Sequence, residues 1–140
     1  MTYTDIIQFW YTEIPPCNWF IKDLDFDTML KRRFGTIHQQ AVAGELASWR
    51  IKPLGQLAEI IVLDQFSRNL FRNSPAAFAC DGQALVLAQT AIAMGADLAL
   101  LPKQKAFMYM PFMHSESAAI HLQAIELFNQ PGLEDNYKFE

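Results

Sequence analysis

The chain has 140 residues, which is enough for one domain of ordinary size with its own hydrophobic core. Hydrophobic residues make up 51% of the sequence and aromatic residues 13%, and this composition excludes a disordered or low-complexity chain. Fifteen acidic residues exceed eleven basic ones, so the formal net charge is −4. Because nucleic acids and anionic membranes attract cationic surfaces, we expect neither as a partner.

The two cysteines, Cys17 and Cys80, permit one disulfide at most, far fewer than a small secreted domain held by disulfides would carry. The N-terminal residues lack the basic start and the apolar stretch of a secretory signal. The most apolar stretches, residues 57–63 and 84–93, are interrupted by polar residues and are too short to span a bilayer. We therefore expect a cytoplasmic protein.

Helical spacing, rather than the alternation typical of strands, recurs along the chain. A first helix is predicted over residues 4–13, because Pro15 and Pro16 stop it. A second helix is predicted over residues 25–44, where apolar residues recur at the spacing of one buried helix face. The members of this face are Phe26, Leu30, Phe34, Ile37 and Ala41.

The middle of the sequence predicts two more helices. Residues 53–71 are apolar on nearly all sides, as expected for a helix in the middle of a bundle. Residues 74–94 begin with Ser74 as the N-cap and Pro75 at the first helical position, and Gly95 lies just past the end.

Two further helices complete the predicted fold. The fifth begins near Pro102 and is expected to break before Pro111, and the sixth covers residues 115–129 and ends at Pro131. Because the connections are short, neighbouring helices should pack antiparallel. The sequence therefore predicts an all-α fold of about six helices, arranged as antiparallel hairpins in a single domain over residues 1–140.

Charged residues lie on a face of the predicted helix 53–71 that should be buried. Asp64 is in line with the apolar residues of that face, Arg68 follows one turn later, and Arg72 lies at the helix end. Burial of either charge alone is costly, so the two should pair or find other partners. One interpretation is an internal Asp64–Arg68 ion pair that locks two helices together. The alternative is a polar pocket in which Arg68 and Arg72 bind an anionic group.

Asp81 is the one charged residue in an apolar seam of the predicted helix 74–94. The seam repeats at alternating intervals of three and four residues, which places its members on one helix face. We interpret Asp81 first as the buried partner of an arginine, Arg68 or Arg72, and second as a catalytic carboxylate.

A third polar group, formed by His114, Ser115 and Glu116, precedes the last predicted helix. Backbone N–H groups at a helix start lack partners, so Ser115 is predicted as the N-cap and Glu116 as an acid that favours the positive end of the helix dipole. The functional alternative is that His114 acts as a general base or a ligand and is oriented by Glu116 or Asp64.

The sequence carries no motif for a metal or an organic cofactor, and we predict neither. His114 and His121 lie seven residues apart, which is roughly 10 Å along a helix axis and too far for one ion to bridge. His38 and His121 are interpreted as histidines of the core or its edge. The nucleophile and phosphate-loop motifs of common enzyme families are also missing.

The order and spacing of these motifs resemble the mainly bacterial family called Domain of Unknown Function 924. The resemblance covers nearly the whole chain. Each matching segment alone is a weak indication of the family, but their order and spacing together are specific to it. They are Trp19-Phe20 with Asp23 and Phe26-Asp27, residues 63–69 (Leu-Asp-Gln-Phe-Ser-Arg-Asn), then Arg72, Pro75, Phe78 and Asp81, and residues 111–116 (Pro-Phe-Met-His-Ser-Glu).

The resemblance implies an all-helical fold similar to that of tetratricopeptide-repeat proteins, and it leaves activity, substrate and cofactor open. Family members usually have proline where this chain has Ser67, so a kink there should be milder. The family also continues with a further helix and an Arg-Phe-Pro-His-Arg-Asn-like segment, which we expect this domain to lack. Residues 133–140 have the pattern of the opening of another helix.

Three functions are open at this point. The first is a helical binding module whose concave polar site holds a small anion or an acidic peptide end. The second is a hydrolase-type enzyme that uses His114 with Asp64 or Glu116, and the third is a structural oligomerisation domain. The predicted ligand-binding residues are Asp64, Arg68, Arg72, Asp81, His114 and Glu116.

Overall fold

The computed structural model of the chain describes residues 1–134, and it contains helices and no strand over that range. The prediction of an all-α fold is confirmed. The α-helices are α1 (Tyr3–Gln8), α2 (Leu24–Val42), α3 (Pro53–Ile61), α4 (Ser67–Leu70), α5 (Asp81–Ala93), α6 (Pro102–Met113) and α7 (Ala118–Phe128).

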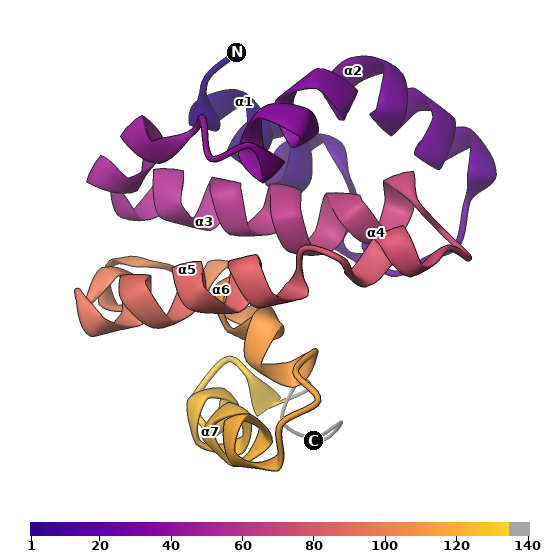
Figure 1. Cartoon of the computed structure of the whole chain (residues 1–140). Helices are drawn as coiled ribbons and strands as arrows, with labels where there is room; N and C mark the ends of the chain where they lie inside the picture. Colours follow the sequence, from indigo (N-terminus) through magenta and orange to yellow (C-terminus); the bar gives the residue numbers. More distant parts are fainter. Residues whose placement is uncertain (135–140) are drawn as a thin grey trace.

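The helices are arranged around α3 and α4. Figure 1 shows α1 and α2 on one side of these two helices, α5 and α6 on the other side, and α7 at the far end beside α6. Short turns of tighter or wider helix connect or extend the α-helices. They are π-helical at Phe9–Glu13 and Val62–Phe66, and 3-10 helical at Pro16–Asn18, Ala47–Ile51, Pro75–Phe78 and Ala96–Ala99.

The central helical segment runs through α3, the π-helical turn Val62–Phe66 and α4 without interruption. Every residue from 55 to 67 is buried, which confirms the prediction of a helix in the middle of the bundle. α5 runs antiparallel to this segment, as predicted. Asp81 at its start contacts Arg68 near the end of the segment, whereas Met94 just past its end accepts from Gln56 near the beginning. The likeness to tetratricopeptide-repeat proteins stays a prediction.

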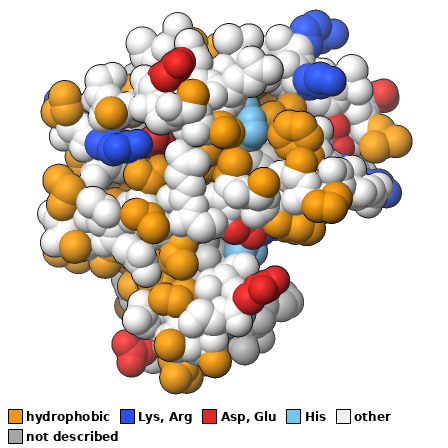
Figure 2. Space-filling model, in the orientation of Figure 1, with side chains coloured by type: hydrophobic (Ala, Val, Ile, Leu, Met, Phe, Trp, Pro, Cys, Tyr) orange, Lys and Arg blue, Asp and Glu red, His pale blue; other side chains and the backbone are white. Residues whose placement is uncertain are grey.

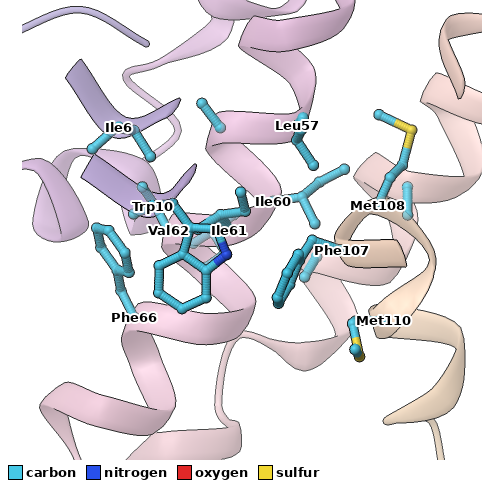
Figure 3. Packing of buried hydrophobic residues seen from close by; sticks show 14 of the residues in the cluster. Ile6, Trp10, Leu57, Ile60, Ile61, Val62, Phe66, Phe107, Met108 and Met110 are labelled. Atoms are coloured by element: carbon cyan, nitrogen blue, oxygen red, sulfur yellow. The ribbon is translucent and has the colours of Figure 1, made fainter. Parts of the chain in front are cut away.

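The hydrophobic core is rich in aromatic rings. Figure 3 shows Trp10 between Phe66 of the central segment and Phe107 of α6. The ring centroids of Trp10 lie 6.0 Å from Phe66 and 5.3 Å from Phe107. The apolar face predicted for α2 contributes to the same core, since Leu30, Phe34, Ile37 and Ala41 are buried and Phe26 is half-buried. Burial of these large side chains supplies most of the stabilisation that a domain of this size needs.

The prediction that the helix starting at Pro102 breaks before Pro111 was wrong, because α6 continues to Met113 with Pro111 inside it. A proline inside a helix removes its own N–H donor and its ring crowds the carbonyl four residues earlier, and here the proline lies in the last turn of the helix. His114 still donates its backbone N–H to Met110 O at 3.1 Å, so the turn closes after the proline. Pro111 and Phe112 are buried, and this burial offsets the lost bond.

The predicted helix 74–94 is divided into the 3-10 turn Pro75–Phe78 and α5. Ser74 caps the 3-10 turn as expected, with its Oγ accepting from Ala76 N at 3.3 Å. Gly95 has a φ of +76°, the left-handed conformation that favours glycine after a helix end. The sequence therefore predicted both ends of this helical stretch correctly, but it did not predict the break between the 3-10 turn and α5.

The stretch Pro75–Ala93 is long and apolar enough to cross a membrane, with a mean hydropathy of 1.3. One such stretch is weak evidence of a membrane-spanning helix, since core helices of soluble proteins can be equally long and apolar. The expectations about membrane and compartment stay predictions. The helix opening expected at residues 133–140 lies, from residue 135 onward, outside the described residues.

Candidate functional site

The buried carboxylate of Asp64 is the centre of the site. Asp64 lies in the π-helical turn Val62–Phe66. Such turns are rare in proteins, and those that occur are often found at functional sites. Its side chain is only 1% exposed, so its charge needs partners within the protein. The donors are Gln65 Nε2 at 2.9 Å to Oδ2, and Arg68 Nη1 at 3.2 Å and His114 Nδ1 at 2.8 Å to Oδ1.

The bond from His114 fixes which ring nitrogen carries the proton. An ionised carboxylate only accepts hydrogen bonds, so Asp64 selects the tautomer of His114 with a proton on Nδ1. No described residue bonds to Nε2 of this ring, and Nε2 is not among the buried polar atoms that lack a partner. The unprotonated Nε2 is therefore accessible, on a side chain that is 22% exposed.

Arg68 connects the central segment to α5. Its Nη1 and Nη2 donate to Oδ1 and Oδ2 of Asp81, both at 2.9 Å, in the bidentate geometry that makes arginine–carboxylate pairs strong. Nη1 also donates to the backbone oxygen of Asp64 at 2.9 Å. The guanidinium lies 5.3 Å from the ring centroid of Phe78. Arg68 is thus the arginine partner of Asp81, and it pairs with Asp64 as well.

A pocket of about 650 Å³, called the larger pocket from here on, opens over these groups between the start of α5 and the end of α6. Its wall is apolar at Phe78, Leu85 and Pro111. Figure 2 shows acidic and histidine side chains side by side where the main body of the molecule meets its C-terminal part. The charged and polar side chains that line the pocket are Arg68, Asp81, His114, Ser115 and Glu116.

Comparison with known proteins places the chain in a family. The sequence pattern of a family described as bacterial protein of unknown function (DUF924) matches residues 6–139. The chain belongs to the DUF924 family. It is similar to a solved structure of a protein of unknown function from Agrobacterium tumefaciens, with 34% identity and a TM-score of 0.88 over 97% of this chain and 78% of that one. No curated protein matches the chain.

In this DUF924 chain, Arg72 does not line the larger pocket. Its Nε and Nη2 donate to Asp27 of α2 at 2.7 and 3.1 Å, and Asn69 Nδ2 donates to the same carboxylate at 3.0 Å. Partial burial opposes ionisation of Asp27, but the hydrogen bonds from Arg72 and Asn69 hold the pKa of this carboxyl below its ordinary value. Arg72 therefore belongs to a second ion pair, between α2 and the segment after α4.

Ser115 plays a different part from the one predicted, and the structure decides which of the two carboxylates named for His114 contacts it. Ser115 is not the N-cap of α7, since Ser117 caps that helix by accepting from Ile120 N at 3.4 Å. Ser115 Oγ instead accepts from Ser117 N in the turn before the helix. Glu116 is exposed at the pocket and makes no described bond to His114, so the carboxylate that orients His114 is Asp64.

Sequence reasoning missed the roles of Gln65 and Asp27. Adjacent residues of a regular α-helix point about 100° apart, so periodicity gave no reason for Gln65 to contact Asp64. Both residues lie in the π-helical turn Val62–Phe66, which no pattern in the sequence predicted. Asp27 contributed to the family resemblance, but its distance of 45 residues from Arg72 hid the pairing.

The remaining two histidines do not line the larger pocket. His38 is buried in the core, where its Nε2 lies 2.7 Å from Ser67 Oγ, and burial lowers its pKa. His121 is half-buried, and its Nε2 contacts the backbone oxygen of Ser115. Among residues 1–134, no three His, Cys, Asp or Glu side chains are grouped so as to hold a metal ion. The predictions on metal and cofactor stay predictions.

Proposed function

We propose that this chain binds a small molecule in the larger pocket and that His114 exchanges a proton with that molecule at Nε2. One observation carries the proposal: Asp64 is buried, bonded to Nδ1 of His114, and itself fixed by Gln65 and Arg68. A histidine that merely filled space would not need a buried carboxylate held in place by two other side chains.

The arrangement suits general acid–base chemistry. Imidazole is the side chain best able to transfer protons near neutral pH, and a carboxylate at Nδ1 both orients the ring and stabilises the imidazolium that forms. Nε2 is the atom left to take a proton from a bound hydroxyl, amine or water. Ser115 is the one serine, threonine or cysteine among the described residues that line the pocket, and its Oγ accepts from Ser117 N and has no described bond to His114 that would activate it as a nucleophile. The chemistry that we propose is therefore proton transfer without a covalent intermediate.

The charges of the larger pocket favour a neutral or cationic molecule. Asp81 and Glu116 line it, and the charge of Arg68 is already offset by Asp64 and Asp81. An anion placed there would meet more negative than positive charge. The small anion expected from the sequence is therefore not what we propose for this pocket.

A thermal-shift screen tests binding without a guess about chemistry, because a molecule that binds only the folded state raises the melting temperature. We expect neutral or cationic metabolites to stabilise the wild type and the control Arg33→Gln, whose pair with Glu13 lies outside the larger pocket, and to lose this effect with His114→Gln. The proposal fails if folded His114→Gln keeps the same ligands with unchanged shifts. It also fails if no compound shifts the wild type while Arg68→Ala unfolds, since the cluster would then be structural.

The reactivity of the ring tests the proton-transfer part separately. Diethyl pyrocarbonate modifies accessible neutral imidazole nitrogens, and peptide mass mapping gives the rate at each histidine. We expect His114 to react faster than the buried His38, and a ligand from the screen to protect it. If His114 reacts no faster than His38, then Nε2 is not the open base that we propose.

A further inference from the structure

Arg68 also lines a second, smaller pocket of about 150 Å³, together with Arg72. We propose that this second pocket is a binding site for a small oxyanion, the carboxylate or phosphate group of a ligand, held between the two guanidinium groups. The proposal goes beyond the proton transfer assigned to His114, which does not line this pocket. The other residues of its wall are Trp19, Phe20, Ile21, Gln65 and Asn69.

The signs of the charges distinguish the two pockets. Two arginines and no acidic residue line the smaller pocket, whereas Asp81 and Glu116 oppose one arginine in the larger one. The amides of Gln65 and Asn69 add polar atoms to the smaller wall. Arginine is the side chain best suited to carboxylate and phosphate, because its planar fork offers several donors to two oxygens at once.

Both arginines keep unused donors. A guanidinium carries five N–H groups. Arg72 uses Nε and Nη2 on Asp27, and Arg68 uses Nη1 and Nη2 on Asp64 and Asp81. Within residues 1–134, no partner occupies Nη1 of Arg72 or Nε of Arg68, and neither atom is buried without a partner. These two groups are therefore open to water or to a ligand.

The carboxylates that pair with the arginines hold them in place before a ligand arrives. Arg72 is tied to α2 by two bonds to Asp27, and Arg68 is tied to α5 by two bonds to Asp81. Side chains that are already ordered lose little conformational entropy on binding. Asp27, Asp64 and Asp81 together balance the charges of both arginines, so an oxyanion would be recognised by the unused N–H donors and not by net charge. A free inorganic ion should therefore bind weakly, and a larger acid or phosphate ester more tightly.

The size and the aromatic wall indicate how the rest of such a ligand would lie. Pockets that enclose a whole drug-sized ligand measure about 300 to 1,000 Å³, so the smaller pocket fits a single functional group. Phe20 is 65% exposed and Ile21 is 54% exposed at its edge. The apolar or planar part of the ligand would pack on these side chains. Trp19, also in the wall, provides a fluorescent reporter at the site.

The test titrates the protein with sodium phosphate and with sodium acetate at constant ionic strength, with sodium chloride as the reference salt, and follows tryptophan fluorescence. We expect saturable binding of at least one oxyanion in the wild type. Arg72→Gln should weaken it about tenfold, because one charge-assisted hydrogen bond is lost. The control is Arg33→Gln, which removes a similar bidentate pair, with Glu13 at 3.0 and 3.3 Å, outside the smaller pocket.

A second measurement uses the wild type alone, in case Arg72→Gln does not fold. Phenylglyoxal modifies guanidinium groups, and peptide mass mapping follows each arginine. The oxyanion that binds should protect Arg68 and Arg72 and leave Arg33 unprotected. Binding of phosphate alone indicates a phosphate ester as the ligand, and binding of acetate alone indicates a carboxylic acid. The proposal is overturned if neither phosphate nor acetate changes the tryptophan fluorescence more than chloride does. It is also overturned if the bound ion protects neither Arg68 nor Arg72 from phenylglyoxal and Arg72→Gln binds it as tightly as the wild type.

Discussion

Arg68 and Asp81 join two antiparallel helices through two parallel hydrogen bonds of 2.9 Å, although they lie thirteen positions apart in the sequence. Nη1 of the same guanidinium bonds to Asp64, whose other partners are Gln65 and His114. A single side chain thus connects the central segment, α5 and the histidine of the larger pocket. Arg68 is therefore both the structural link of this cluster and a wall of the two pockets.

We expect Arg68→Ala to lower the free energy of unfolding by about 3 kcal/mol, because it leaves the buried Asp64 with one charge partner fewer and Asp81 unpaired. Glu13→Ala is the control, since it breaks the Arg33–Glu13 pair, in which both side chains are more than 40% exposed, and leaves Arg33 over the rings of Phe9 and Phe34. Exposed pairs contribute about 0 to 1 kcal/mol. Urea denaturation measures both variants, and equal losses would contradict the structural role of Arg68.

Asp64→Asn should change the tautomer of His114. The amide has almost the same shape as the carboxylate, but it is neutral and no longer selects a proton on Nδ1. We expect the fraction of His114 with its proton on Nε2 to rise, as seen in the ¹⁵N chemical shifts of the ring. Asp81→Asn should leave these shifts unchanged, because Asp81 bonds to Arg68 and not to the ring. A tautomer that is the same in all three proteins would refute this coupling.

His38 should make stability depend on pH. Burial lowers its pKa in the folded state below the value of about 6.5 expected in the unfolded chain. As the pH falls below about 6.5, the unfolded state takes up a proton that the folded state does not, so stability is lost with a slope of up to about 1.4 kcal/mol per pH unit. Above that pH this contribution is fully present.

Unfolding free energies of the wild type and His38→Gln, measured between pH 7.5 and pH 5, isolate this contribution. The variant lacks the titrating ring, so the difference between the two proteins should shrink as the pH falls. A difference that does not change with pH would show that His38 titrates alike in both states.

Gly55 is required by a close approach of α3 to the preceding turn. A Cβ at this position would lie 1.9 Å from the backbone oxygen of Trp49, so the backbone itself would have to move. Gly55→Ala should cost at least the 1 to 3 kcal/mol or so typical of overpacking. Gly82→Ala is the matched control, because nothing lies within 4 Å of its Cβ. It should be neutral or stabilise by about 0.4 to 1 kcal/mol in the same denaturation assay.

Much of the fold followed from local patterns in the sequence. The apolar face of α2 and the limits set by Ser74 and Gly95 depend on residues within one helix, and periodicity and capping report on such residues directly. The charges of Asp64 and Arg68 on a buried face were visible for the same reason, and so was their need for partners. What failed at this level was the effect of Pro111, where burial outweighed a local preference for breaking the helix.

The Asp64–Arg68 pair lies within one helical segment and was predictable from spacing, but the other partners of these charges were decided by tertiary structure. His114 reaches Asp64 across 50 residues of sequence, and Arg72 reaches Asp27 across 45. Such contacts depend on how helices pack, and no spacing within one helix encodes them. The sequence by itself determined an all-α chain with buried charges that must pair. Packing decided that Arg68 pairs with Asp81 and Arg72 with Asp27, and it thereby divided one predicted site into two pockets with different charges.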